Sequence, residues 1–468
     1  MKARIIMLYK AVFLILVPVV FLQAPAISQK KGDTHADTLS LKDLLRRGNF
    51  NAAIRLYQMN TINEGTLKDY TSLAVGAGIG YETPEFKGWQ FKLSGFFIFN
   101  LASSDLSKPD PLTNQFSRYE LGLFDLTDPS NKTNMDRLEE LFLKYRFKKT
   151  TASIGRQVLK TPFINPQDGR MRPTLEEAIW VNSKDIKNLT LQGGWISRVS
   201  PRSTQKWYTT GKSIGVYSPG VDEFGKPSAY VNNTSSKGIG MLGVSYDKKI
   251  KIQAWNTWVQ NVMNTFLLQA DKNLDLNNGN KIVLGLQLIA QQQSGNGGNA
   301  DTAKQYYANG NRAFAISSRL GYEKNRTQVN INYTRITRTG RYLLPREWGV
   351  DPFYTFMPRE RNEGYGDLQA INTNFIYHTK NEKWEIRSGY GYYRLPDIKD
   401  FKFNKYGMSS YHQVNAQLTC HFTGFWKGLE AMLLLVYKDA AGETYHNPRY
   451  TDNKVNLFHS SLVFNYRF

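Results

Sequence analysis

The chain has 468 residues, a net charge of +21 at pH 7 and one cysteine, Cys420. One cysteine excludes an intrachain disulfide framework, and the lack of any apolar run of about 18 residues after the N-terminus excludes transmembrane helices. A basic chain suits nucleic acid, acidic lipid or anionic solutes, but the charges stand singly rather than in Lys/Arg blocks, which disfavours nucleic acid.

The first 28 residues have the pattern of a secretory signal peptide. Three basic residues precede the apolar run 11–22, and small residues follow it. A basic region, a short apolar core and a small-residue cleavage site define such a peptide, and we expect cleavage after Ala26 or Ser28. The chain is therefore predicted to be exported, with residues 29–48 forming a short periplasmic segment.

Residues 49–468 are predicted to form one barrel domain of about eighteen β-strands. In one example, Leu141, Leu143, Tyr145 and Phe147 lie on the face opposite Glu140, Lys144 and Arg146. Such a period of two marks a strand whose faces meet different environments. Strands of about 10 residues are long enough to cross a membrane at a tilt. A mean hydropathy of −0.47 fits this arrangement, because only alternate residues face lipid.

The links between the predicted strands alternate in length. Short links are 148–151, 247–249, 323–326, 379–383 and 423–428, and long links are 101–137, 160–177, 200–237, 294–311, 339–366, 395–408 and 439–454. Short periplasmic turns and long outer loops are typical of an up-and-down membrane barrel. The pattern places both ends of the mature chain on the periplasmic side. Aromatic residues near the short turns predict an interfacial girdle: Trp89, Phe147, Tyr246, Tyr322, Trp384 and Phe468.

The last strand, 455–468, alternates in the same way and ends on an aromatic residue. Leu462, Phe464, Tyr466 and Phe468 share one face, which we expect to face lipid, with Phe468 beside the first strand near Phe50. This ending resembles the terminal strand of bacterial outer-membrane barrels. The resemblance implies that the strand is recognised by the barrel-assembly machinery of a Gram-negative bacterium.

Two long loops carry unusual residues. The segment 155–177 contains three prolines and charges of both signs, and the segment 346–364 is rich in Trp, Phe, Pro and Arg. Loops of this composition can pack and hold a shape, whereas a merely solvated loop is rich in Gly, Ser and Asn. If they fold into the lumen, their charged side chains can build a constriction.

The first loop reads G-R-x-x-x-x-T-P from Gly155 and then D-x-R-x-x-P from Asp168. This pattern resembles the third outer loop of the OprD family of substrate-specific outer-membrane porins. The second loop, E-W-G-x-D-P-F-Y-T-F-M-P-R-E-R-N-E-G from Glu347, resembles a loop of the Bacteroidetes-type members of that family. The resemblance implies an eighteen-stranded pore, inward-folded loops at a narrow eyelet, and a ladder of basic wall residues that guides carboxylate-bearing solutes.

Carried onto this chain, the resemblance implies an eyelet built by Asp168, Arg170, Arg172, Arg359, Glu360 and Arg361. Inward register predicts the basic ladder as Arg55, Lys144, Arg146, Arg338 and Arg387. The planar guanidinium fork suits this task because it pairs bidentately with carboxylate or phosphate. The competing interpretation is that Arg–Glu pairs inside a barrel only hold the loops to the wall.

Catalysis is not expected, because the strand histidines show no Ser/His/acid grouping. The sequence has no Cys/His metal spacing and no phosphate-cradling glycine loop, so we expect neither metal nor cofactor. We predict an all-β outer-membrane barrel that gives passive, selective diffusion of small anionic or carboxylate-bearing solutes, with outer-membrane lipid as its other partner. The alternatives are a pore for uncharged or zwitterionic oligomers such as sugars and peptides, or a structural or adhesive barrel with an occluded lumen.

Overall fold

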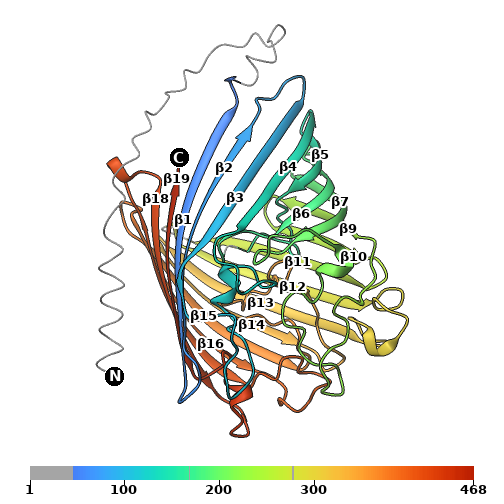
Figure 1. Cartoon of the computed structure of the whole chain (residues 1–468). Coiled ribbons are helices and arrows are strands. Elements are labelled where there is room, and N and C mark those ends of the chain that lie inside the picture. Colours follow the sequence, from blue (N-terminus) through green and yellow to red (C-terminus); the bar gives the residue numbers. More distant parts are fainter. Residues whose placement is uncertain (1–45, 168, 277–278) are drawn as a thin grey trace. The chain divides into compact units, whose positions relative to one another are not determined.

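The computed structural model describes residues 46–167, 169–276 and 279–468, which form one antiparallel sheet that closes on itself (Figure 1). Strand β1 (Asn49–Asn63) pairs with β2 (Tyr70–Glu82) on one side and with β19 (Leu457–Arg467) on the other. The predicted all-β barrel is thus confirmed. The predicted signal peptide and most of the segment 29–48 lie outside the described residues.

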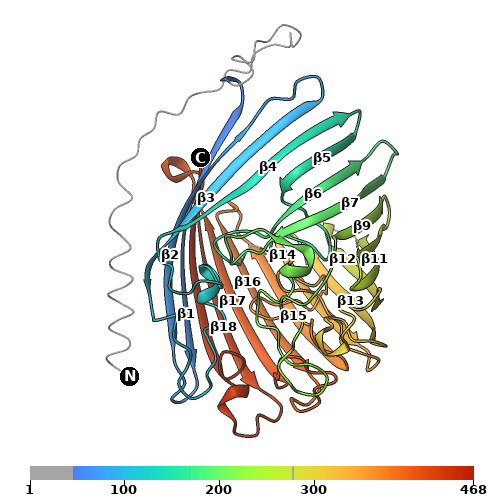
Figure 2. The same cartoon turned by 45° about the vertical axis from the view of Figure 1, so that its right-hand side comes forward.

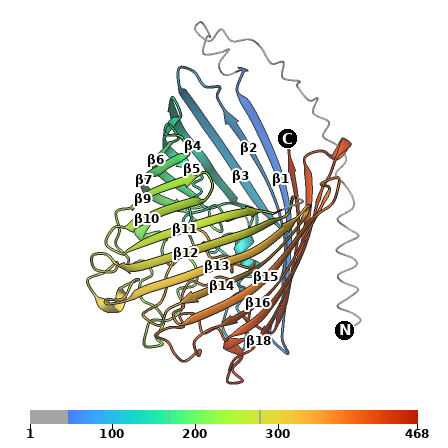
Figure 3. The ribbon, with the colours of Figure 1, turned by 180° about the vertical axis from the view of Figure 1, so that it is seen from behind.

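The remaining strands follow one another around the wall in chain order, as Figure 3 shows for β9 to β16. They are β3 (Trp89–Ser103), β4 (Met135–Phe147), β5 (Thr150–Gln157), β6 (Leu175–Ser183), β7 (Leu189–Ser200), β8 (Tyr208–Thr209), β9 (Ile239–Asp247), β10 (Lys251–Val259), β11 (Met263–Asp275), β12 (Lys281–Gln293), β13 (Arg312–Lys324), β14 (Thr327–Ile336), β15 (Leu368–His378), β16 (Trp384–Arg394), β17 (Tyr411–His421) and β18 (Leu429–Ala440). The two-residue strand β8 pairs only with the end of β7, which itself pairs with β9, so eighteen strands of the described chain form the wall.

The helical segments are short: η1 (Leu121–Leu123), α3 (Thr210–Ser213), η3 (Thr302–Lys304), η4 (Gly424–Trp426) and η5 (Pro448–Tyr450). Among the residues described, no helix is long and apolar enough to cross a membrane. The backbone hydrogen bonds of the wall are made between neighbouring strands.

The final strand β19 has the two faces that its sequence predicts. His459 and Ser461 are fully buried on the inner face, whereas Phe458 and Phe468 are exposed on the outer face. The backbone N–H of Phe468 donates to the carbonyl of Ala52 (3.0 Å), so the chain ends beside the first strand. The apolar outer face and the polar inner face are those of a barrel with lipid outside and solvent inside.

The links are sorted by length between the two ends of the barrel. Long loops 104–134, 158–174, 201–238, 294–311, 337–367, 395–410 and 441–456 gather at one end. Figure 2 shows the short turns at the end where the C-terminus lies. This sorting matches the prediction except that two links at the long-loop end, 64–69 and 260–262, are also short.

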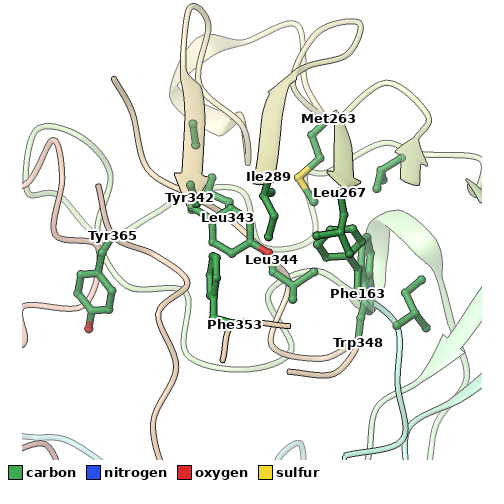
Figure 4. Close-up of a cluster of buried hydrophobic side chains, with 14 of the residues drawn as sticks. Phe163, Met263, Leu267, Ile289, Tyr342, Leu343, Leu344, Trp348, Phe353 and Tyr365 are labelled. Carbon is green, nitrogen blue, oxygen red and sulfur yellow. The ribbon is translucent and has the colours of Figure 1, made fainter. Parts of the chain in front are cut away.

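The loops 158–174 and 337–367 pack inside the barrel around an apolar cluster (Figure 4). Phe163, from the first loop, and Trp348 and Phe353, from the second, lie beside Leu267 and Ile289 of the wall. Trp348 is fully buried, and removal of such an aromatic side chain typically costs about 3–5 kcal/mol. The two loops therefore have a packed core of their own, which fixes the side chains that they carry.

Candidate functional site

Arg359 joins both inward loops to the seam between β1 and β19. Its Nη2 donates to Tyr57 Oη (2.9 Å) and to Ser461 Oγ (2.7 Å), while its Nη1 donates to the carbonyl of Gly169 (3.3 Å). A positive φ of 75° at Arg359 is unusual for a residue other than glycine. Residues from four distant segments thus meet at one point inside the barrel.

Arg170 lies next to this junction and is 7% exposed. Its backbone carbonyl accepts a hydrogen bond from Arg55 Nη1 (2.7 Å), and its own Nη1 donates to the carbonyl of Gly169 (2.8 Å). A Cβ at Gly122 would lie 2.4 Å from Arg170 Nε, so only glycine at this position leaves room for the guanidinium in its present place.

Two further arginines complete what we call the eyelet cluster: Arg170, Arg202, Arg359 and Arg361. Arg202 Nη1 lies 3.3 Å from the position of a Cβ on Gly169, and Arg361 Nη2 donates to Gln167 Oε1 (2.5 Å). No member of the cluster forms an ion pair with a described residue. Asp168, which follows Gln167 in the chain, lies outside the described residues.

The eyelet cluster concentrates positive charge in a buried place. Burial, followed by the charges of Arg202 and Arg359, lowers the pKa of Arg170 from its ordinary value. Burial, followed by Arg202 and Arg346, lowers the pKa of Arg361 to about 10. A guanidinium starts from so high a pKa that it keeps its charge at neutral pH. The cluster is therefore cationic and would be stabilised by an added anion.

The eyelet cluster also has unused hydrogen-bond donors. Buried Nε atoms of Arg170, Arg202 and Arg359, and Nη1 of Arg361, have no hydrogen-bond partner among the described residues. Buried donors without partners are costly. A carboxylate, with two oxygens that accept only, is the group that guanidinium forks pair with best.

Arg172 has different surroundings from Arg170, although the two are neighbours in the motif. Its guanidinium pairs with Glu139 of β4 and stacks over Phe96 of β3 at 3.5 Å from the ring centroid. Glu139 also accepts from Arg137 Nη2 (3.0 Å). Arg172 thus binds loop 158–174 to the wall.

Glu360 is the centre of a second buried ion-pair network. Its carboxylate accepts from Arg118 Nη2 (2.9 Å) and Lys438 Nζ (3.0 Å), and Arg346 Nη2 lies 3.9 Å away. Burial alone would raise the pKa of Glu360, but the three cations outweigh it and lower the pKa to about 2. This network ties loop 337–367 to loop 104–134 and to β18.

The predicted ladder residues do not form one row of free charges. Lys144 lies 3.7 Å from Glu82, Arg146 pairs with Glu85 (2.9 Å) and Arg387 pairs with Glu385 (2.5 Å). Arg338 lies beyond the end of β14 in loop 337–367, where it pairs with Asp367 and Asp400, both at 3.2 Å. Its predicted wall position is therefore corrected, because the strand ends two residues earlier. Arg55 contacts the eyelet directly through the carbonyl of Arg170.

Sequence reasoning missed three residues at this site. Arg202 follows the end of β7 in a loop without any recognised motif, and Tyr57 and Ser461 belong to alternating strands. Tyr57 has the same register as Arg55, and Ser461 lies on the face opposite Leu462, but many residues share these registers. Only the fold shows that all three converge on Gly169 and Arg359.

Comparison with known proteins agrees with this architecture. The model of the family described as outer membrane porin, OprD family, matches residues 120–353, which is half of the chain. No curated protein matches. The narrower resemblance to Bacteroidetes-type members finds no support, since the relatives given below come from Pseudomonas and Acinetobacter.

Solved structures show the same fold at low identity. The crystal structure of Pseudomonas aeruginosa OpdK with vanillate is 13% identical with a TM-score of 0.69, covering 91% of this chain and 99% of that one. P. aeruginosa OccK9 (OpdG) is 13% identical with a TM-score of 0.71, covering 91% of this chain and 99% of that one. Acinetobacter baumannii OccAB3 is 15% identical with a TM-score of 0.71, covering 90% of this chain and 99% of that one. Together with the family model, the closed barrel and its inward loops show that the chain belongs to the OprD family of outer-membrane porins.

Proposed function

We propose that this porin gives passive diffusion to small anionic solutes, and to carboxylates in particular, through the eyelet cluster. The observation that carries the proposal is the group of buried guanidinium groups that have unused N–H donors and no ion-pair partner among the described residues. A carboxylate would supply acceptors to these donors and relieve the mutual repulsion of the cations.

The eyelet cluster suits transit rather than retention. Arg359 already donates to Tyr57 Oη and Ser461 Oγ, and Arg361 donates to Gln167. A passing carboxylate exchanges with these neutral acceptors, and the acceptors return when it leaves. Selective pores need contacts strong enough to admit a solute and weak enough to release it. Partial satisfaction by neutral groups supports such a balance.

The six eyelet residues implied by the resemblance fall into groups according to the residues that they contact. Arg170, Arg359 and Arg361 face the passing solute in our proposal, with Arg202 added. Arg172 and Glu360 hold the loops, as the competing interpretation of Arg–Glu pairs expected. The part played by Asp168 remains a prediction.

The proposal is tested by liposome swelling with the double variant Arg170→Ala/Arg359→Ala. We expect the permeation of a small carboxylate, relative to an uncharged sugar of similar size, to fall about tenfold, the equivalent of about 1.4 kcal/mol. The sugar rate in the same vesicles reports how much folded protein is inserted. Arg338→Ala, which removes a paired arginine from an outer loop, is the matched control and should leave the ratio unchanged.

The same assay separates the competing functions. An unchanged ratio in the double variant would contradict the eyelet assignment. Sugars or peptides that pass faster than carboxylates through the native protein would favour a pore for uncharged or zwitterionic oligomers. If none of the solutes causes swelling, a barrel with an occluded lumen is favoured.

A further inference from the structure

A cavity of about 480 Å³ lies on the inner face of β6 to β11. Two inward loops contribute to it through Lys160, Thr161, Pro162 and Pro352, and Lys184, Asp247 and Lys251 mark its extent toward the periplasmic turns. None of the eyelet arginines lines it. Its volume is in the range of pockets that hold small molecules, so it is a candidate for a second contact site along the solute path.

The wall of the cavity is a row of amide and hydroxyl groups. Thr190, Ser245, Gln253 and Gln269 stand directly opposite one another across β7, β9, β10 and β11. Gln192 lies in the next row. The side chains thus present both donors and acceptors along one continuous surface.

Three of these five side chains make no hydrogen bond with another described residue. In the described part of the chain, the side chains of Thr190, Gln192 and Ser245 make no side-chain hydrogen bond, and Asn182 Oδ1 is buried without a partner. Gln253 accepts from Trp255 Nε1 (3.1 Å), which leaves its amide nitrogen free. Gln269 differs, because it donates to Asp271 Oδ2 (2.6 Å) and accepts from Gln287 Nε2 (2.9 Å). The capacity available to a solute therefore comes from Thr190, Gln192, Ser245 and Gln253.

Amides elsewhere on the lumen wall behave differently. Asn332 Nδ2 donates to Asn330 Oδ1 (2.8 Å) and to Asn372 Oδ1 (2.7 Å) across β14 and β15. Asn372 Nδ2 is buried without a partner among the described residues, so it is closed to a solute. Unpartnered amide nitrogens outside the cavity, such as those of Asn372 and Asn415, are buried, whereas Gln192 and Gln253 line open space.

An indole ring forms part of the same surface. Trp255 is 3% exposed, and a Cβ at Gly243 would lie 2.5 Å from its ring, so the ring lies flat over the backbone of β9. Because Trp255 lines the cavity but is almost wholly covered, it adds a small apolar patch beside the rows of amides. A sugar-like solute, with C–H faces and several hydroxyls, has the complementary chemistry.

We propose that this cavity binds the polyhydroxylated part of a solute, so that the preferred solute is a sugar acid. The assignment of its carboxylate to the eyelet rests on the proposed function, whereas the hydroxyl site rests on the cavity alone. The cavity is lined by three lysines, Lys160, Lys184 and Lys251, and by one carboxylate, that of Asp247. Its net charge is therefore positive, which suits an anionic solute. A hydroxyl-poor acid leaves the amides unpaired, and sites built for hydrogen bonds discriminate strongly against such analogues.

The test measures how two solutes block the chloride current of the purified protein in planar bilayers. Gluconate carries five hydroxyls, and benzoate carries the same charge without hydroxyls. We expect Gln192→Leu/Gln253→Leu to raise the half-blocking concentration of gluconate about tenfold and that of benzoate less than about twofold. Retained chloride current shows that the variant is folded and inserted.

Controls separate the two proposals. Gln417→Leu removes a lumen-facing amide of β17 outside the cavity and should leave gluconate block unchanged. Equal shifts for both solutes, or no shift, in the Gln192/Gln253 variant would overturn the hydroxyl site. Arg170→Ala/Arg359→Ala should weaken block by both solutes, and if it changes neither, the proposed eyelet function fails while the cavity assignment stands.

Discussion

At the scale of single residues, a charged side chain acts according to its partners. Glu360 is 4% exposed and contacts Arg118, Arg346 and Lys438, three cations from three segments. Removal of one partner from a buried ion pair leaves an uncompensated charge and typically costs about 3–5 kcal/mol. Glu360 therefore holds the inward loops, and its loss should loosen the constriction.

We predict that Glu360→Gln increases the single-channel conductance and the current noise, because Arg118 and Lys438 lose their counter-charge. Arg172→Gln, which frees the other anchor at Glu139, should act in the same direction. Single-channel recording in planar bilayers measures both quantities. A Glu360→Gln channel with native conductance, noise and thermal stability would contradict the anchoring role.

The pH dependence of the conductance follows from the pKa of Glu360. Since the pKa of Glu360 in the folded protein is lowered to about 2 from 4.5, its contribution is present above about pH 4.5 and is lost as the pH falls toward 2. Burial raises the pKa of Asp351 to about 6, so its proton uptake occurs at a higher pH. Native conductance should therefore rise below about pH 4.5, whereas Glu360→Gln should show no rise in that range.

At the scale of elements, the loop 337–367 is held by apolar packing as well as by charge. Trp348 is fully buried among the cluster residues, and its Nε1 donates to Ser213 Oγ (2.9 Å). The wall strands do not depend on this contact, because their hydrogen bonds run between neighbours. The loop can therefore loosen while the barrel stays closed.

We predict that Trp348→Ala destabilises the inward loops by about 3–5 kcal/mol without opening the barrel. Hydrogen exchange should speed up in loop 337–367 and in the segment 158–174, while β14 and β15 keep their protection. Phe224→Ala, which truncates an exposed aromatic residue in loop 201–238, is a matched control. Exchange that speeds up equally in strands and loops would mean that the loop packing supports the whole barrel.

At the scale of the whole molecule, strands and loops were predictable because their signals are local. The alternation around Leu141 and the ending at Phe468 each identify a strand from neighbouring residues alone. The partners at the site come from distant segments: Glu139 with Arg172, Lys438 with Glu360, and Arg202 beside Gly169. No local pattern indicates such pairs, so the motif marked the right loops but did not separate solute-facing arginines from anchoring ones.

Strand ends and turn lengths are a second feature that could be predicted from the sequence only in part. Arg338 has the alternation expected of β14, but the strand ends at Ile336 and its side chain pairs with loop carboxylates. The short outer links 64–69 and 260–262 break the rule of long outer loops. Boundaries depend on packing against neighbouring loops, which local sequence does not record.

The reversal potential of the native protein measures whether the buried arginines make the pore prefer anions. The protein is reconstituted in a planar bilayer with different KCl concentrations on the two sides, and the voltage of zero current is measured. The cationic eyelet, in a chain of net charge +21, predicts a reversal potential of the sign set by chloride, which shifts toward zero in Arg170→Ala/Arg359→Ala. A reversal potential of the sign set by potassium would mean that the pore prefers cations and that the eyelet arginines do not set its selectivity.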